Sequence, residues 1–193
     1  ISFHVRNRTN GSLVSSGQTR RYLLYVPRSY DRSKPTPLVI SIHGAGGWST
    51  QQMNISEWNR LAESQRFIVV CPLAAESAGP RIWHVKRGSG LAKDVRFISE
   101  LIDKLEADYN IDPGRIYANG FSNGGGMSFV LSCTLSDRSA AAGMVPAAQT
   151  PPWSWWTDPP AVQMVRCQRT ARAAIPHTGA RTRRAPPSPP PGT

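Results

Sequence analysis

The chain has 193 residues, and 23 Lys and Arg against 12 Asp and Glu give it a formal net charge of +11 at pH 7. This length predicts a single domain that can bury a sizeable core. No run of about eighteen apolar residues occurs, so the sequence indicates no membrane-spanning helix.

The first part of the chain alternates between strand and helix patterns. Apolar runs predict strands at residues 21–26, 37–42 and 67–71, and a helix at residues 56–65. The run at 37–42 is continuous and is followed by the glycine-rich loop His43–Gly47, as is typical of a buried parallel strand. Taken alone, that loop could equally be a tight turn between a strand and a helix.

Residues 92–108 have the spacing of an amphipathic helix. Its apolar residues recur at intervals of three and four: Val95, Ile98, Leu101, Ile102 and Leu105. We expect its charged residues to lie on the solvent face: Lys93, Asp94, Glu100, Asp103, Lys104 and Glu106. The sequence Asp112-Pro113-Gly114 predicts a turn after the helix.

The most informative stretch is Gly120-Phe121-Ser122-Asn123-Gly124. It lies between a predicted strand at 115–119 and a predicted helix at 124–133, and a further strand is predicted at 141–146. The pattern G-x-S-x-G between a strand and a helix is that of a nucleophile elbow, in which crowding of the serine requires glycine on both sides. Ser122 is therefore the candidate nucleophile.

The same arrangement predicts an oxyanion hole. One N–H would come from Asn123, directly after the nucleophile, and the other from Ala45 or Gly44 in the glycine-rich loop. Alternating strands and helices also predict a three-layer α/β sandwich, with a mostly parallel sheet and helices on both faces.

Several segments together resemble a known family, the secreted polyhydroxybutyrate depolymerase and feruloyl esterase group of α/β-hydrolases, related to carbohydrate esterase family one. The matching segments, in the family's order and spacing, are Arg21–Pro27, Leu38–Gly47, Trp58 with Leu61-Ala62, Phe67–Pro72, Trp83, Asp94–Ile98, Tyr109–Asp112 and Arg115–Met127. The resemblance covers residues 20 to about 165.

This resemblance implies a serine esterase that acts outside the cell without a metal or other cofactor. Acyl transfer from an ester to Ser122 would be followed by hydrolysis of the acyl-enzyme. The implied substrates are polyhydroxyalkanoate oligomers or acyl esters on plant polysaccharide, and both remain open. The alternative is a non-catalytic, ligand-binding remnant of the same fold.

That alternative arises from the carboxy-terminal part of the chain. After Asp158 there is no acidic residue, and the six following basic residues are all arginine. We expect an esterase domain at 1–165 that lacks its last strands and helices, and a disordered tail rich in Pro and Arg at 166–193. Arg172 stands where the resembled family has its catalytic aspartate, and the family's histidine would come after the end of this chain.

The four histidines offer few replacements for that base. In the resembled family the histidine at the position of His43 is structural. His84 lies beside Trp83 in a loop, where a surface or lid role is expected, and His177 lies in the basic tail. A replacement base would have to be His84 or His177.

The remaining features are ambiguous. In the resembled esterases the cysteine at the position of Cys133 often forms a disulfide. Its partner would be expected near Trp156, where this chain has no cysteine, so the alternative is that the cysteines are buried thiols. The cluster Trp153–Trp156 could line a substrate cleft or cover the edge of the sheet. The net charge would suit a nucleic-acid-binding protein, but no nucleic-acid motif or basic helical stripe occurs, and we expect no such partner.

Overall fold

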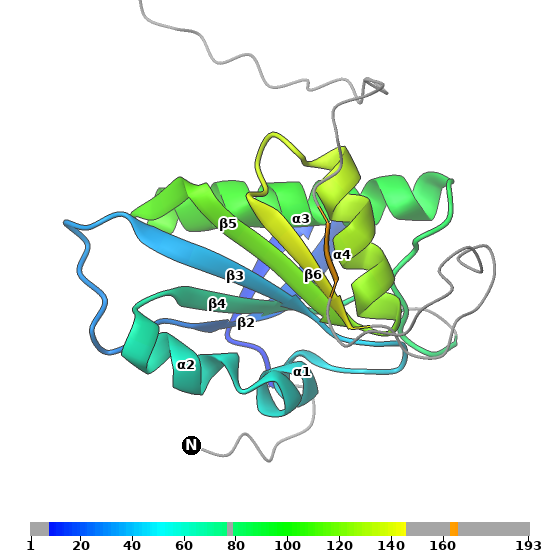
Figure 1. Ribbon diagram of the computed structural model, residues 1–193. Helices are drawn as coiled ribbons and strands as arrows, with labels where there is room; N and C mark the ends of the chain where they lie inside the picture. Colours follow the sequence, from blue (N-terminus) through cyan, green and yellow to red (C-terminus); the bar gives the residue numbers. More distant parts are fainter. Residues whose placement is uncertain (1–7, 77–78, 146–162, 166–193) are drawn as a thin grey trace, which may run out of the picture.

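A computed structural model of the chain describes residues 8–76, 79–145 and 163–165 (Figure 1). The strands are β1 (Gly11–Ser15), β2 (Gln18–Tyr25), β3 (Thr36–Ile42), β4 (Ile68–Pro72), β5 (Ile111–Phe121), β6 (Ala141–Val145) and β7 (Gln163–Val165). The helices are α1 (Ser49–Ser56), α2 (Trp58–Gln65), α3 (Ser89–Asp108) and α4 (Asn123–Thr134).

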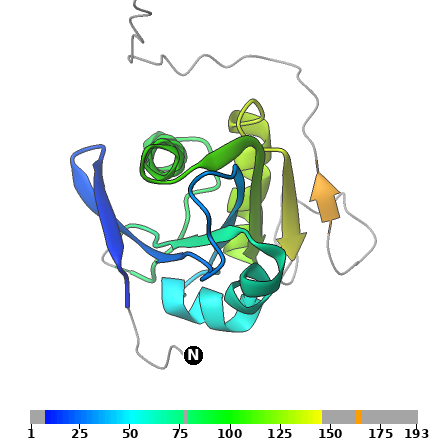
Figure 2. The ribbon, with the colours of Figure 1, turned by 90° about the vertical axis from the view of Figure 1, so that its left-hand side faces the viewer.

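The described strands form one seven-stranded sheet in the order β1-β2-β4-β3-β5-β6-β7. The central strands pair in parallel, β3 with β4 and β5, and β5 with β6. The antiparallel pairs lie toward the two edges. Helices α3 and α4 cover one face of the sheet and α1 and α2 the other (Figures 1 and 2). This arrangement confirms the predicted three-layer α/β sandwich.

Successive residues of each central strand enter opposite cores, because side chains alternate between the faces of a sheet. In β3, Leu38, Ile40 and Ile42 pack into the larger core with α3 and α4. Val39 points the other way, into the smaller core that contains Met53 of α1. Because both faces of the strand are covered, its sequence is mostly apolar, and its polar residues Thr36 and Ser41 are buried as well.

Two elements in the first part of the chain were missed by the sequence analysis. Strand β1 precedes β2 in a hairpin whose turn, Ser16-Gly17, has φ values of 50° and 74°. Helix α1 precedes the predicted helix, and Glu57, at φ 52°, separates it from α2. The sequence of α1 is polar with no apolar stripe, so periodicity gave no signal for it.

The predicted turn at Asp112-Pro113-Gly114 lies inside β5 instead of before it. The pairing with β3 shifts there, since Thr36 pairs with Ile111 but Leu38 pairs with Ile116. The Asp112 carboxylate accepts a hydrogen bond from the Gly114 N–H at 2.9 Å, as in an isolated turn. The local turn chemistry is therefore present, but the sheet resumes on both sides of it.

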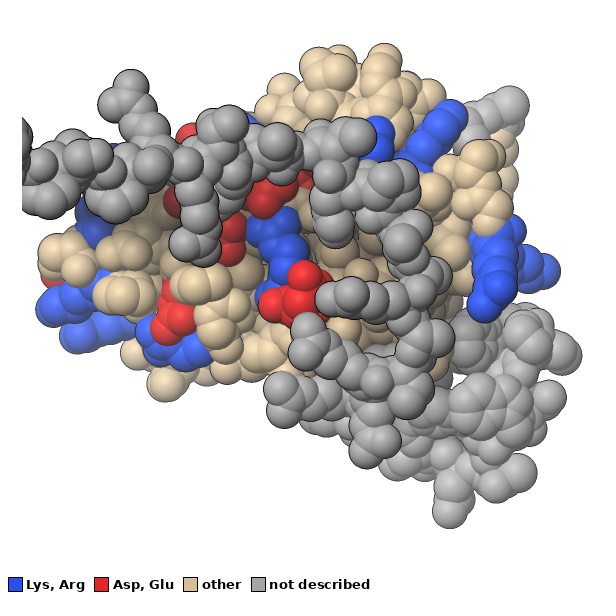
Figure 3. Space-filling view, turned by 90° about the horizontal axis from the view of Figure 1, so that it is seen from above, with Lys and Arg blue, Asp and Glu red and all other residues tan. Residues whose placement is uncertain are grey.

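Helix α3 corrects the prediction for Asp94. This carboxylate was expected on the solvent face, but it is 1% exposed. Of the other charged residues predicted for that face, Lys93 and Asp103 are exposed, and Glu100, Lys104 and Glu106 are half-buried. Arg138 Nη1 lies 2.7 Å from Asp103 Oδ1, and its Nη2 lies 3.0 Å from Glu106 Oε2. Basic and acidic side chains lie beside one another on the upper face of the molecule (Figure 3).

Candidate active site

The predicted elbow forms between β5 and α4. Ser122 has φ 54° and ψ −119°, a conformation that a residue with a side chain rarely adopts. A Cβ atom added to Gly120 would lie 2.3 Å from the Gly124 carbonyl, and one added to Gly124 would lie 2.2 Å from the Ile42 oxygen. Both glycines are therefore required by close backbone approach, and the strained serine is held at the carboxyl end of the parallel strands.

The glycine-rich loop after β3 lies directly against this serine. A Cβ atom added to Gly44 would lie 3.4 Å from the Cβ of Ser122 and 3.3 Å from the Phe121 oxygen. The structure thus brings together two segments that are nearly eighty residues apart in the sequence, because β3 and β5 are neighbours in the sheet.

His43 fixes the conformation of this loop. The Ala74 N–H can only donate, so Nε2 of His43 accepts this 3.1 Å bond, and the ring proton is on Nδ1. Nδ1 then donates to the Gly44 oxygen at 2.7 Å. His43 is 1% exposed, and burial lowers its pKa from 6.5 to about 4. It is therefore a neutral structural residue, in keeping with the role that the family resemblance implied.

The hydrogen bonds that hold the two loops leave the N–H groups of Ala45 and Asn123, the candidate oxyanion donors, free to bind a substrate oxygen. The Gly44 oxygen also accepts the Gly47 N–H at 3.0 Å, and the Ser122 oxygen accepts the Gly126 N–H at 3.1 Å. In a trans peptide the N–H points opposite to the carbonyl, so the N–H groups of Ala45 and Asn123 point away from these bonds. In the part of the chain that the structure describes, neither of them donates to a backbone carbonyl.

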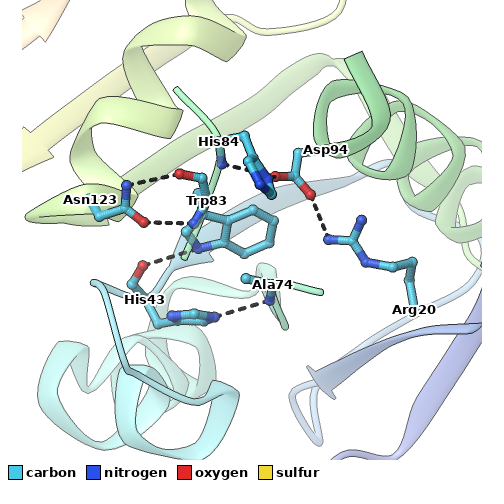
Figure 4. A network of polar contacts seen from close by, with 7 residues as sticks. All are labelled: Arg20, His43, Ala74, Trp83, His84, Asp94 and Asn123. Atoms are coloured by element: carbon cyan, nitrogen blue, oxygen red, sulfur yellow. Dashed lines mark hydrogen bonds and ion pairs between the residues drawn. The ribbon is translucent and has the colours of Figure 1, made fainter. Parts of the chain in front are cut away.

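A polar network that the sequence analysis did not foresee lies beside the elbow (Figure 4). The side-chain amide of Asn123 is bonded to the backbone of Trp83, which is 1% exposed. The next residue, His84, is bonded to Asp94, and Asp94 to the buried Arg20. One signal was available: Asp94 lies four residues before Ile98, so it belongs to the apolar face of α3.

The candidate bases are placed as follows. His84 has a side chain 47% exposed, and its Nδ1 lies 2.8 Å from Asp94 Oδ2. Among the described residues no histidine side chain is hydrogen-bonded to Ser122. Arg172 and His177 lie outside the described residues, as do Trp153–Trp156 and Cys167. Cys71 is buried, and burial raises the pKa of its thiol.

Neither a metal-binding cluster nor a membrane-spanning helix is present among residues 8–76, 79–145 and 163–165. Across those ranges no group of three or more His, Cys, Asp or Glu side chains is arranged to hold a metal ion. No helix among the same residues is long and apolar enough to cross a membrane.

Curated relatives of the chain are esterases. Feruloyl esterase C of Emericella nidulans is 33% identical over 141 residues, which cover 71% of this chain and 49% of that protein. Feruloyl esterase B of Piromyces equi is 33% identical over 123 residues, which cover 64% of this chain and 23% of that protein. The chain therefore spans less than half the length of these relatives.

Solved structures share the fold. Acetyl xylan esterase from Aspergillus awamori has a TM-score of 0.57 and 23% identity, with 76% of this chain and 52% of that one covered. A ferulic acid esterase from Anaeromyces mucronatus, in complex with ferulic acid, has a TM-score of 0.53 and 22% identity, with 71% of this chain and 57% of that one covered.

A family model covers most of the sequence. The model, with the description "Putative esterase", matches residues 14–182. The fold carries a strained serine between two glycines, as expected for such an enzyme. Because the family model matches most of the sequence, this chain belongs to the esterase family of α/β-hydrolases.

Proposed function

We propose that the protein hydrolyses carboxylic esters through an acyl-enzyme on Ser122. The observation that carries this proposal is the conformation of Ser122, φ 54° and ψ −119°, at the junction of β5 and α4. Strain of this kind costs on the order of 1–3 kcal/mol and persists where the surrounding structure and function require it. It places the half-buried Ser122 at the carboxyl end of β5, against Gly44 of the neighbouring loop.

In this mechanism the serine oxygen attacks the ester carbonyl carbon. The negative charge that develops on the carbonyl oxygen is stabilised by the N–H groups of Ala45 and Asn123, which the loop hydrogen bonds leave available. The bond from the acyl carbon to the alkoxy oxygen then breaks, and the alcohol leaves with the proton that the Ser122 hydroxyl gives up. Water adds to the acyl-enzyme in the same way, and its proton returns to the Ser122 oxygen as the acid is released. We assign the first donor to Ala45, with Gly44 as the alternative, because the Gly44 oxygen accepts two hydrogen bonds and so fixes the peptide that carries the Ala45 N–H.

The substrate class that we propose is an acyl ester of plant polysaccharide. Relatives named feruloyl esterase, at 33% identity, support this class over polyhydroxyalkanoate oligomers. A polysaccharide of the plant cell wall is met outside the cell, so we propose an extracellular site of action. The expected measurement is a higher kcat/KM for methyl ferulate than for a 3-hydroxybutyrate oligomer.

The nucleophile is tested with p-nitrophenyl butyrate and the purified chain. Because no histidine among the described residues is bonded to Ser122 to act as its general base, we expect slow hydrolysis. Ser122→Ala should abolish it, whereas Ser136→Ala, at an exposed serine just after α4, should not. Turnover that survives in Ser122→Ala would show that the proposed function is wrong.

A further inference from the structure

We propose that one short segment, Arg81–His84, sets the geometry of the oxyanion hole, and that the Asn123 side chain is the positioning residue through which it acts. We call these four residues the bridging segment. The proposal rests on the function proposed above, since the hole has a role only if Ser122 is acylated. It assigns a task to the Asn123 side chain that is distinct from that of the Asn123 backbone N–H.

On the elbow side, the bridging segment holds Asn123 by two hydrogen bonds. The Trp83 N–H donates to Asn123 Oδ1 at 2.7 Å, and Asn123 Nδ2 donates to the Trp83 oxygen at 3.0 Å (Figure 4). The backbone groups of Trp83 fix which end of the amide donates and which accepts. Two parallel bonds hold the plane of the amide as well as its position, so the first residue of α4 cannot rotate freely.

On the loop side, the same segment holds the residues that flank Ala45. The Gly46 N–H donates to the Arg81 oxygen at 2.7 Å. The Trp83 indole Nε1 donates to the His43 oxygen at 3.1 Å. Ala45 thus lies between two residues that are bonded to the bridging segment, and Trp83 contacts both halves of the proposed hole.

The bridging segment is itself fixed to the core by Asp94 of α3. The His84 N–H and ring Nδ1 both lie within hydrogen-bond distance of Asp94 Oδ2, at 2.9 and 2.8 Å. The other carboxylate oxygen accepts Arg20 Nη2 at 2.9 Å, and both side chains of this pair are nearly buried, at 3% and 2% exposure. The Arg20 guanidinium also lies 4.1 Å from the centre of the Phe97 ring.

This arrangement matters because the two oxyanion donors come from different loops. Hydrogen bonds from the hole stabilise the developing charge only if both N–H groups converge on one point. A displacement of about 1 Å in such a site can cost on the order of 100-fold in rate. Bonds from the bridging segment to both loops hold the donors of Ala45 and Asn123 in a fixed relation to one another.

The contacts of His84 favour this structural role over a role as the general base. Its Nδ1 is bonded to Asp94, a contact that a catalytic histidine would also make, but its ring has no hydrogen bond to Ser122 among the described residues and lies against the first turn of α3. A Cβ atom added to Gly90 would lie 2.6 Å from two ring carbons and 3.0 Å from Nε2. Nε2 is therefore packed beside α3, and we assign His84 to the attachment of the bridging segment.

The test compares Asn123→Ala with Asn119→Ala. Asn119 lies on β5 and is also half-buried, and its Oδ1 accepts bonds from Ser41 Oγ at 3.0 Å and Trp58 Nε1 at 3.2 Å. Removing either amide deletes two side-chain hydrogen bonds, but only Asn123 is bonded to the bridging segment. Both variants keep the backbone N–H of Asn123.

With p-nitrophenyl butyrate, we expect Asn123→Ala to lower kcat by about 10- to 100-fold with KM within about threefold of the wild type. Inhibition by butylboronic acid, which forms a tetrahedral adduct on serine, should weaken by a similar factor. Asn119→Ala should leave kcat and boronic-acid inhibition within about threefold, although it lowers the melting temperature. Equal kinetic losses in the two variants would overturn the proposal.

Hydrogen exchange gives a readout that does not depend on activity. We expect the Gly46 amide, which is bonded to Arg81, to exchange at least about tenfold faster in Asn123→Ala and at an unchanged rate in Asn119→Ala. If Ser122→Ala retains turnover, the proposed function fails, and the exchange rates alone decide whether Asn123 couples the two loops. Unchanged exchange at Gly46 in Asn123→Ala would show that it does not.

Discussion

At the scale of single residues, the site depends on backbone groups that side-chain chemistry cannot replace. The N–H of Ala45 belongs to a peptide whose carbonyl is held by His43 and Gly47, and the N–H of Asn123 opens α4. Substitutions that keep or remove an N–H can therefore distinguish an effect on the proposed oxyanion hole from an effect on folding.

The Ala45 N–H is tested by proline. Ala45→Pro removes the donor and should lower the turnover of an activated ester by on the order of 100- to 1,000-fold. Ala45→Gly keeps the N–H and is the matched control, with turnover within about fivefold of the wild type. Circular dichroism checks that both variants are folded. Unchanged turnover in folded Ala45→Pro would place the hole elsewhere.

His43 predicts a dependence of stability on pH. Burial lowers its pKa from 6.5 to about 4, so the unfolded chain binds more protons than the folded one between these values. Stability should therefore fall as the pH is lowered from 6.5 to 4, by up to about 3 kcal/mol from this residue. Urea unfolding at several pH values measures it. His43→Gln should flatten the slope in this window, and an equally steep slope in that variant would contradict the prediction.

At the scale of secondary-structure elements, one buried ion pair joins strand β2 of the sheet to helix α3. Arg20 of β2 and Asp94 of α3 are almost completely shielded from water, and their partners are each other, the Trp83 and Phe97 rings, and His84. Removing one partner leaves a buried charge without its counter-charge. The resulting decrease in the free energy of unfolding is much larger than the net stabilisation that the intact pair provides.

Asp94→Asn should therefore lower the free energy of unfolding by about 3–5 kcal/mol. The control is Asp108→Asn, because Asp108 pairs with Lys104 at 2.8 Å on the same helix, with side chains 45% and 38% exposed. Its loss should cost less than about 1 kcal/mol. Denaturant unfolding compares the two, and similar losses would mean that Arg20 finds another way to be solvated.

At the scale of the whole molecule, the proposed division into a domain at residues 1–165 and a basic tail at 166–193 can be tested by truncation. The family match ends at residue 182. The last thirteen residues, Arg181–Thr193, contain no large apolar side chain. Nothing in their composition predicts a contribution to a core.

Deleting Arg181–Thr193 should change the melting temperature by less than about 2 °C, because a segment without core-forming side chains is expected to contribute within about 0.5 kcal/mol. Differential scanning calorimetry on the two chains is the measurement. A drop of many degrees would mean that this segment packs against the domain. The deletion also removes three arginines and so lowers the net charge. Comparing the solubility of the two chains tests whether these arginines keep the chain soluble.

The sequence by itself determined the local chemistry of the site. Gly120 and Gly124 identify the elbow, since close backbone approach excludes any side chain there. The apolar run at 37–42 and its glycine loop predicted β3 and the loop beside Ser122. Such signals depend on neighbours within a few residues, so a pattern of residue types is enough to find them.

Only the tertiary structure decided which distant residues meet. Asp94 was expected in solvent, because charge alone does not reveal that Arg20, 74 residues earlier in the chain, supplies its partner. The pairing of Asn123 with Trp83 spans 40 residues and follows from the packing of a loop against the elbow. These contacts depend on the order of strands in the sheet and the paths of the loops between them, and local sequence patterns do not encode those long-range pairings.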